Sequence, residues 1–109
     1  MENAFDEKIR INGLYDAYGL LLTEKQRRTM EYYYRDDYSL SEIAALSGVS
    51  RTAVHELIRV AVGHLEDYEA ALGVVRMRTR AEDMKRRLEE LGVKDAALAR
   101  LFEEFDKTE

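Results

Sequence analysis

The stretch Tyr38–Gly63, YSLSEIAALSGVSRTAVHELIRVAVG, decides the fold of this chain. Ser39 and Glu42 have the Ser-x-x-Glu spacing of a capping box, which begins a helix. Gly48 supplies the left-handed backbone on which such a helix ends, and Ser50 is placed to cap the next helix. A helix, a tight glycine turn and a second capped helix in this order predict a helix-turn-helix.

An ordinary helical hairpin in a bundle needs the same caps and glycine, and it stays the alternative. After Ser50, apolar residues recur at three-and-four spacing, which places them on one face of a helix. The residues predicted to be buried on that face are Val54, Leu57, Ile58, Ala61, Leu65 and Tyr68. We expect this helix to run from Arg51 to about Leu72 and to stop at Gly73. Gly63 within it would permit a close helix crossing or a slight bend.

Composition favours an all-α protein. The chain has 109 residues, no cysteine and no proline, so a disulfide and a thiolate metal site are excluded. A chain of this length forms one domain, or one domain with an extension. We predict a helix-turn-helix domain over residues 1–73 and a charged C-terminal helical extension over residues 74–109. The polar N-terminus and the lack of a long apolar run predict a cytoplasmic protein without a membrane span.

Two helices are expected before the motif. The first spans about Phe5–Tyr18, and the second begins after Thr23, which has capping-box spacing to Gln26. Tyr33 and Tyr34 belong to this second helix. Because their spacing is helical, it favours a place in the core over stacking on nucleobases.

A helix over about Val75–Leu91 and a last helix capped by Asp95 are expected after the motif. In the longer helix, apolar residues alternate four-and-three, the pattern of a coiled-coil seam: Met77, Ala81, Met84, Leu88 and Leu91. Because only about two heptads are present, an antiparallel pairing within the protein and a homodimer both stay open. The same helix carries a basic cluster that we expect to contact a partner: Arg76, Arg78, Arg80, Lys85, Arg86 and Arg87.

The net charge of −5 argues against a protein that simply coats nucleic acid. Five residues lie on the outward face of the second helix of the motif: Arg51, Thr52, His55, Glu56 and Arg59. In a DNA-binding protein this face would enter the major groove, where Glu56 could accept from a cytosine amino group. Residues of the preceding helix could supplement them: Thr23, Lys25, Arg27 and Arg28. A solvated helix face is the alternative interpretation.

No residue pattern points to catalysis, a metal or another cofactor. His55 and His64 are nine positions apart on one helix, and at about 100° per residue they lie on opposite sides. The sequence has no Gly-rich phosphate loop and no nucleophile elbow. Glu66, Asp67 and Glu69 are expected on a solvated helix face. We therefore expect a non-enzyme.

The sequence resembles the YlxM family of small bacterial proteins associated with the signal recognition particle. The matching segments lie between about Ile11 and Leu72 and include INGLYDAYGLLLTEKQR, YYRDDYSLSEIA, VSRTAV and LEDYE. On the contact face, Arg51 and Arg59 match the family's pattern, whereas Thr52 and His55 differ from it.

The resemblance implies a helix-turn-helix bundle similar to the DNA-binding fourth conserved region of bacterial sigma factors. In many bacteria the family's gene lies beside those of the particle's GTPase and its receptor. The implied role is therefore an accessory or regulator of co-translational protein targeting that binds the particle's RNA or its GTPase. A DNA-binding transcriptional regulator that uses the face of the second helix is the alternative.

Overall fold

The computed structural model describes residues 4–106, and this part of the chain consists of helices and short connections without a strand. In chain order the helices are α1 (Ala4–Tyr18), η1 (Gly19–Leu21), α2 (Glu24–Met30), η2 (Glu31–Arg35), α3 (Leu40–Ser47), α4 (Arg51–Leu72), α5 (Val74–Glu90) and α6 (Ala96–Asp106). The prediction of an all-α protein is confirmed. None of these helices is both long enough and apolar enough to cross a bilayer.

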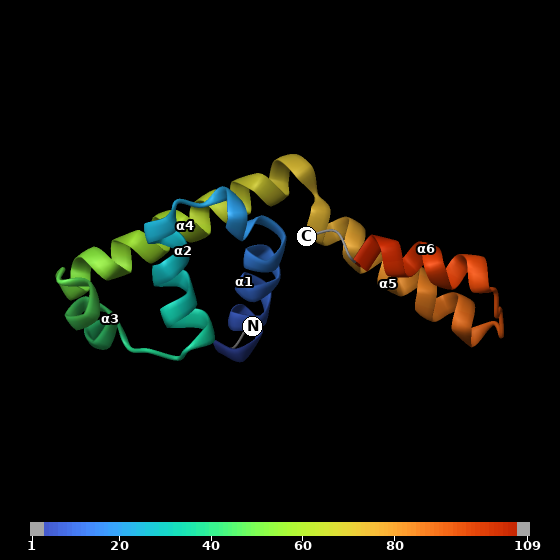
Figure 1. Ribbon diagram of the computed structural model, residues 1–109, viewed down its shortest axis with the longest axis horizontal. Helices are drawn as coiled ribbons and strands as arrows, with labels where there is room; N and C mark the ends of the chain where they lie inside the picture. The colour runs from blue at the N-terminus through green and yellow to red at the C-terminus, as the bar shows by residue number, and fades with distance from the viewer. Residues whose placement is uncertain (1–3, 107–109) are drawn as a thin grey trace.

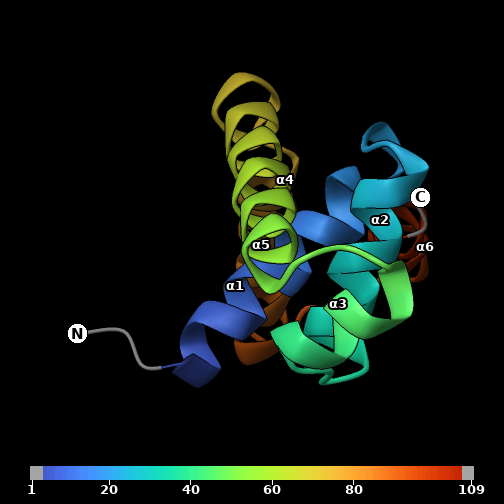
Figure 2. The ribbon, with the colours of Figure 1, turned by 90° about the vertical axis from the view of Figure 1, so that its left-hand side faces the viewer.

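The molecule is elongated and measures 55 × 28 × 23 Å along its principal axes. At one end, α1, α2, α3 and α4 with the short helices η1 and η2 form a bundle. At the other end, α5 and α6 form an antiparallel hairpin (Figure 1). Helix α4 runs the length of the bundle and ends where α5 begins. Figure 2, which looks along the long axis, shows α2 and α3 together on one side of α4.

The core lies where α4 packs on the other helices of the bundle. Its buried residues come from every α-helix of the bundle and from the turn after η1: Ile11, Leu14, Tyr18, Leu22, Met30, Ile43, Val54, Ile58, Ala61 and Leu65. Four of the residues predicted to face inward on α4 are therefore buried. The other two, Leu57 and Tyr68, are half-buried.

The capped turn between α3 and α4 has the predicted geometry. The Ser39 hydroxyl accepts a hydrogen bond from the amide of Glu42 at 3.1 Å, and the Glu42 carboxylate accepts one from the amide of Ser39 at 3.0 Å. Gly48 ends α3 with a φ of 69°. The Ser50 hydroxyl then accepts from the amide of Ala53 at 3.0 Å and begins α4. The helix-turn-helix prediction is confirmed.

Two local expectations differ from the structure. The helix after Thr23 turns from α-helical to π-helical over Glu31–Arg35, so Tyr33 and Tyr34 pack against the core without entering it. Their ring centroids are 4.9 Å apart in an edge-to-face arrangement. Gly63 does not serve a close helix crossing, because a Cβ added there would meet nothing within 4 Å.

The expected coiled-coil seam of α5 is only half used within the protein. Ala81 and Leu88 are half-buried, whereas Met77, Met84 and Leu91 remain exposed by 50%, 59% and 64%. Asp95 accepts a hydrogen bond from the amide of Leu98 at 3.0 Å and begins α6 as expected. The antiparallel pairing with α6 is therefore present, and it leaves one side of α5 open.

Candidate nucleic-acid or partner interface

The exposed face of α4 is the first candidate contact surface. The structure brings Arg51, Thr52, His55 and Arg59 together there, and all four are exposed. Arg51, His55 and Arg59 follow one another at intervals of four residues, which places them along one side of the helix. This start of α4 lies at the end of the molecule opposite to the tip of the α5–α6 hairpin (Figure 1).

The two arginines of this face are not equivalent. Arg59 is paired with Glu56 through two hydrogen bonds, of which the one from Nε to Oε2 is 3.0 Å long. The hydrogen bonds from Arg59 lower the pKa of the Glu56 carboxyl, and the same pair raises the pKa of Arg59. The side chain of Arg51 makes no hydrogen bond or ion pair with any residue in 4–106. Arg51 is thus the more available cation for a phosphate or a carboxylate.

A groove beside this face was not anticipated from the sequence. A hollow of about 420 Å³ lies between the tyrosines of η2 and the exposed side of α4, and Tyr33, Tyr34, His55 and Arg59 line it. A smaller hollow of about 270 Å³ continues from His55 to Arg51. Because His55 lines both hollows, the groove follows α4 along its predicted contact face. Helical spacing could not reveal it, because the π-helical turn sets the position of the tyrosines.

The expected support from the start of α2 is not found beside the groove. The Thr23 hydroxyl is occupied by the capping box of α2. Lys25 and Arg28 line a different hollow, next to Leu46 and Ser47 at the end of α3. Arg28 also pairs with the carboxylate of Glu24 at 2.9 Å. The α4 face therefore depends on its own cations.

The basic residues of α5 do not form one patch. Arg80 and Arg87 are seven residues apart and lie on one side of the helix, whereas Arg78 and Lys85 lie on another, because successive residues are rotated by about 100°. Ion pairs within the described chain also join Arg76 to Glu69, Arg86 to Asp83 and Arg87 to Glu90. A cluster that is compact in the sequence is dispersed around the helix in space.

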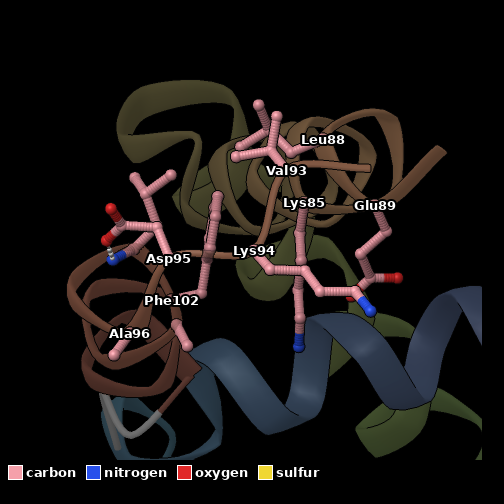
Figure 3. A pocket seen from close by; sticks show the side chains of 10 residues that line it. Lys85, Leu88, Glu89, Val93, Lys94, Asp95, Ala96 and Phe102 are labelled. Carbon is pink, nitrogen blue, oxygen red and sulfur yellow. Dashed lines mark hydrogen bonds between the residues drawn. The ribbon is translucent and has the colours of Figure 1, made fainter. Parts of the chain in front are cut away.

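Lys85 lies at the rim of an apolar cleft between α5 and α6. The cleft has a volume of about 450 Å³. Figure 3 shows Phe102 reaching from α6 toward Leu88 and Val93. Helix α6 thus covers the Lys85 and Leu88 side of α5.

The junction between the bundle and the α5–α6 hairpin contains a buried polar contact that the sequence did not indicate. The Tyr18 hydroxyl donates to the Glu69 carboxylate at 2.6 Å and accepts from the amide of Val74 at 2.9 Å. The same carboxylate accepts from the amides of Val75 and Arg76 at 3.0 and 3.1 Å. Tyr18 and Glu69 together hold the first amides of α5.

The expectation that Glu69 lies on a solvated face is wrong, since its side chain is only 18% exposed. The physical reason is the N-cap of α5, Gly73, which has no side chain to accept from the first amides of the helix. Burial by itself would raise the pKa of Glu69, but the hydrogen bonds from Tyr18 and the α5 amides outweigh it and lower that pKa. Glu66 is likewise engaged, in an ion pair of 3.0 Å with Arg10.

The two histidines are both exposed on α4, but they lie in different surroundings. His55 lies in the groove, whereas the ring of His64 is stacked near that of Tyr68 with centroids 6.5 Å apart. Within residues 4–106, no three histidine or carboxylate side chains gather in a way that could hold a metal ion.

Comparison of the sequence with known proteins places this chain in a family. The family model described as "Putative helix-turn-helix protein, YlxM / p13 like", UPF0122, matches residues 5–105. A UPF0122 protein of Geobacillus kaustophilus is 44% identical over 106 residues, which cover 94% of this chain and 96% of that protein. One from Halalkalibacterium halodurans is 40% identical over 107 residues, 95% and 98% of the two chains. One from Symbiobacterium thermophilum is 54% identical over 66 residues, 61% and 62% of the two chains.

Proposed function

The chain belongs to the UPF0122 family of YlxM/p13-like helix-turn-helix proteins, and from that premise we propose that it is a non-enzymatic accessory protein of the signal recognition particle. It acts in the bacterial cytoplasm and binds the particle's RNA or its GTPase. The observation that carries the proposal is the presence of exposed cationic side chains at both ends of a molecule 55 Å long. Such a shape suits contact with two places on a ribonucleoprotein.

The charge of the α4 face also favours this role over coating a duplex. A protein that binds duplex DNA through its backbone neutralises several phosphates with lysine and arginine. The α4 face offers Arg51 without an ion pair and Arg59 with its charge already paired to Glu56. With a net charge of −5, the long-range electrostatic attraction to a duplex is weak.

A specific observation favours the alternative, a DNA-binding transcriptional regulator. The first turns of α4 are exposed and follow a well-formed turn, as in a recognition helix. In that role Arg51 would contact a guanine edge or a phosphate, and Thr52 and His55 would contact base edges.

Competition binding separates the two functions. The labelled full-length protein is titrated with signal-recognition-particle RNA, random-sequence RNA, the particle's GTPase and duplex DNA between about 50 and 200 mM salt. We expect the particle's RNA or its GTPase to bind in preference to random RNA and duplex DNA. Failure of both, together with nanomolar binding of a defined duplex, would replace the proposal by the DNA-binding alternative.

The Arg51→Gln variant tests the α4 face, with Arg100→Gln on α6 as the matched control. Both arginines are exposed, so neither change should disturb folding. If the ligand is RNA, we expect Arg51→Gln to weaken binding and to reduce the slope of log K against log salt by about 1. Equal behaviour of the two variants would show that α4 does not make the contact.

A further inference from the structure

Helix α5 carries an exposed apolar strip on the side that α6 does not cover. We call Met77, Met84 and Leu91, the residue that caps the end of α5, the outer strip; these side chains are 50%, 59% and 64% exposed. They are seven residues apart, so at about 100° per residue they lie within about 40° of one another around the helix. At a rise of about 1.5 Å per residue the strip is about 21 Å long, which is enough for about four turns of a second helix.

The outer strip is the unused half of the seam of α5. On the neighbouring side, Leu88 is half-buried in the cleft into which Phe102 of α6 reaches (Figure 3). Exposed apolar side chains are common singly, but a straight row of three along one helix is the pattern by which helices associate. Methionine side chains are flexible and adapt to different apolar partners.

Cationic side chains border the outer strip on the edge that α6 leaves open. Arg80 and Arg87 each follow a methionine of the strip by three residues and are exposed next to it. Arg80 has no ion pair within the described chain, and the pair between Arg87 and Glu90, 3.3 Å long, lies in solvent and is weak. Arg78 and Lys85 lie on the flank that faces α6 and are half-buried.

These charges identify the kind of partner. A second copy of α5 packed on the same strip would bring cations against cations, because the edge that α6 leaves open carries Arg80 and Arg87. RNA phosphates would match the arginines but would leave the apolar side chains of the strip in water. Only a surface that is apolar in its centre and acidic at its edges satisfies both features.

We propose that the outer strip binds one amphipathic helix of a protein partner. Apolar side chains of that helix cover Met77, Met84 and Leu91, and acidic side chains beside them pair with Arg80 and Arg87. Helix-on-helix recognition of this kind uses anchors spaced by three, four and seven residues. This inference goes beyond the proposed role in protein targeting. It does not depend on that role, because it is argued from the exposed apolar side chains of the strip and the arginines beside them.

Two synthetic helical peptides of about 18 residues test the proposal by fluorescence anisotropy with the full-length protein. Both have Leu at positions a and d of the heptad, and one has Glu and the other Lys at positions e and g, so that each peptide repels itself. We expect the Glu peptide to bind with a micromolar Kd and the Lys peptide to bind at least about tenfold more weakly. Equal binding of both peptides, or no binding of the Glu peptide, would overturn the proposal.

Variants assign the binding to the outer strip. Met77→Gln/Met84→Gln should weaken binding of the Glu peptide about tenfold or more, because it removes apolar area at the centre of the contact. Arg80→Gln/Arg87→Gln should weaken it severalfold and reduce its salt dependence. Glu82→Gln, a change on the opposite side of α5, is the control and should bind as the unaltered protein does.

Two further results would contradict the proposal that the strip binds a helix of another protein. A dimer of the unaltered chain in sedimentation, together with a monomer of the methionine variant, would assign the strip to a second copy. Loss of RNA binding by the methionine variant, with its peptide binding unchanged, would assign the strip to RNA. Circular dichroism and thermal melting confirm that each variant is folded, and because all five substituted residues are exposed we expect little change in melting.

Discussion

The bundle and the α5–α6 hairpin are both helical, but they are stabilised in different ways. All the fully buried apolar side chains within the described chain belong to the bundle. Between Val74 and Phe105 no residue is fully buried. Because hydrophobic stabilisation grows with the apolar area removed from water, most of the folding free energy must come from the bundle. The hairpin leaves the outer side of α5 exposed, and this side is therefore available for binding.

The largest expected loss of stability comes from a substitution in the core of the bundle. Leu65→Ala removes a side chain that is 0% exposed and should lower the free energy of unfolding by about 2–5 kcal/mol. Leu88→Ala, the matched change in the hairpin, should cost about 1 kcal/mol or less, because Leu88 is only half-buried. Urea unfolding followed by circular dichroism measures both. Equal losses would mean that the hairpin contributes to one common core.

The second largest loss of stability is expected from substitutions at the junction between the bundle and the hairpin. Glu69→Gln and Tyr18→Phe each remove part of the hydrogen bonding that caps α5, and each should cost about 1–3 kcal/mol. Glu66→Gln, which breaks only an exposed ion pair with Arg10, is the control and should cost about 0–1 kcal/mol. If all three variants were equally stable, α5 would not depend on this cap.

The same junction predicts a dependence on pH. The pKa of Glu69 is lower in the folded protein than its ordinary value of 4.5, so the folded state binds this proton less readily than the unfolded state. The stabilisation is therefore complete above pH 4.5 and is lost as the pH falls through the folded-state pKa. Unfolding of the Glu69→Gln variant should lack this part of the acid dependence. If the stability of the Glu69→Gln variant fell with pH in the same way as that of the unaltered protein, the assignment would be contradicted.

The smallest changes in stability are expected from substitution of two glycines, one at the end of α3 and one within α4. Gly48→Ala places a Cβ on a residue with a φ of 69° and should cost about 1 kcal/mol, although nothing lies within 4 Å of that Cβ. Gly63→Ala meets no neighbour either, and it lies within α4, so it should raise stability by about 0.5–1 kcal/mol. Thermal melting measures whether each substitution lowers or raises the stability. A stabilising Gly48→Ala would contradict the left-handed turn.

The helix boundaries could be predicted because they depend on local chemistry. The capping boxes at Thr23 and Ser39, the left-handed Gly48 and the cap at Asp95 each involve residues a few positions apart. The role of Glu69 could not be predicted in this way, since its partner Tyr18 is 51 positions away along the chain. A carboxylate on a helix looks the same in the sequence whether it faces solvent or another helix.

The candidate contact surfaces, like the helices, could be predicted from the sequence only where they depend on local spacing. Periodicity identified the exposed side of α4, and the three-residue spacing of Glu56 and Arg59 could have indicated that this arginine is paired. The groove beside Tyr33 was hidden because a π-helical turn changes which way these side chains lie. The basic residues of α5 are neighbours in the sequence, but the turn of the helix distributes them around its axis.

Hydrogen exchange measured by mass spectrometry tests the division between the bundle and the hairpin most directly. Amides of α1 and α4 around Ile11 and Leu65 should exchange slowly and only through global unfolding. Amides of α6 should exchange at least about tenfold faster through local opening, because α6 contributes no fully buried residue. Equally slow exchange in α6 and α4 would contradict the division and would show that the whole chain unfolds as one unit.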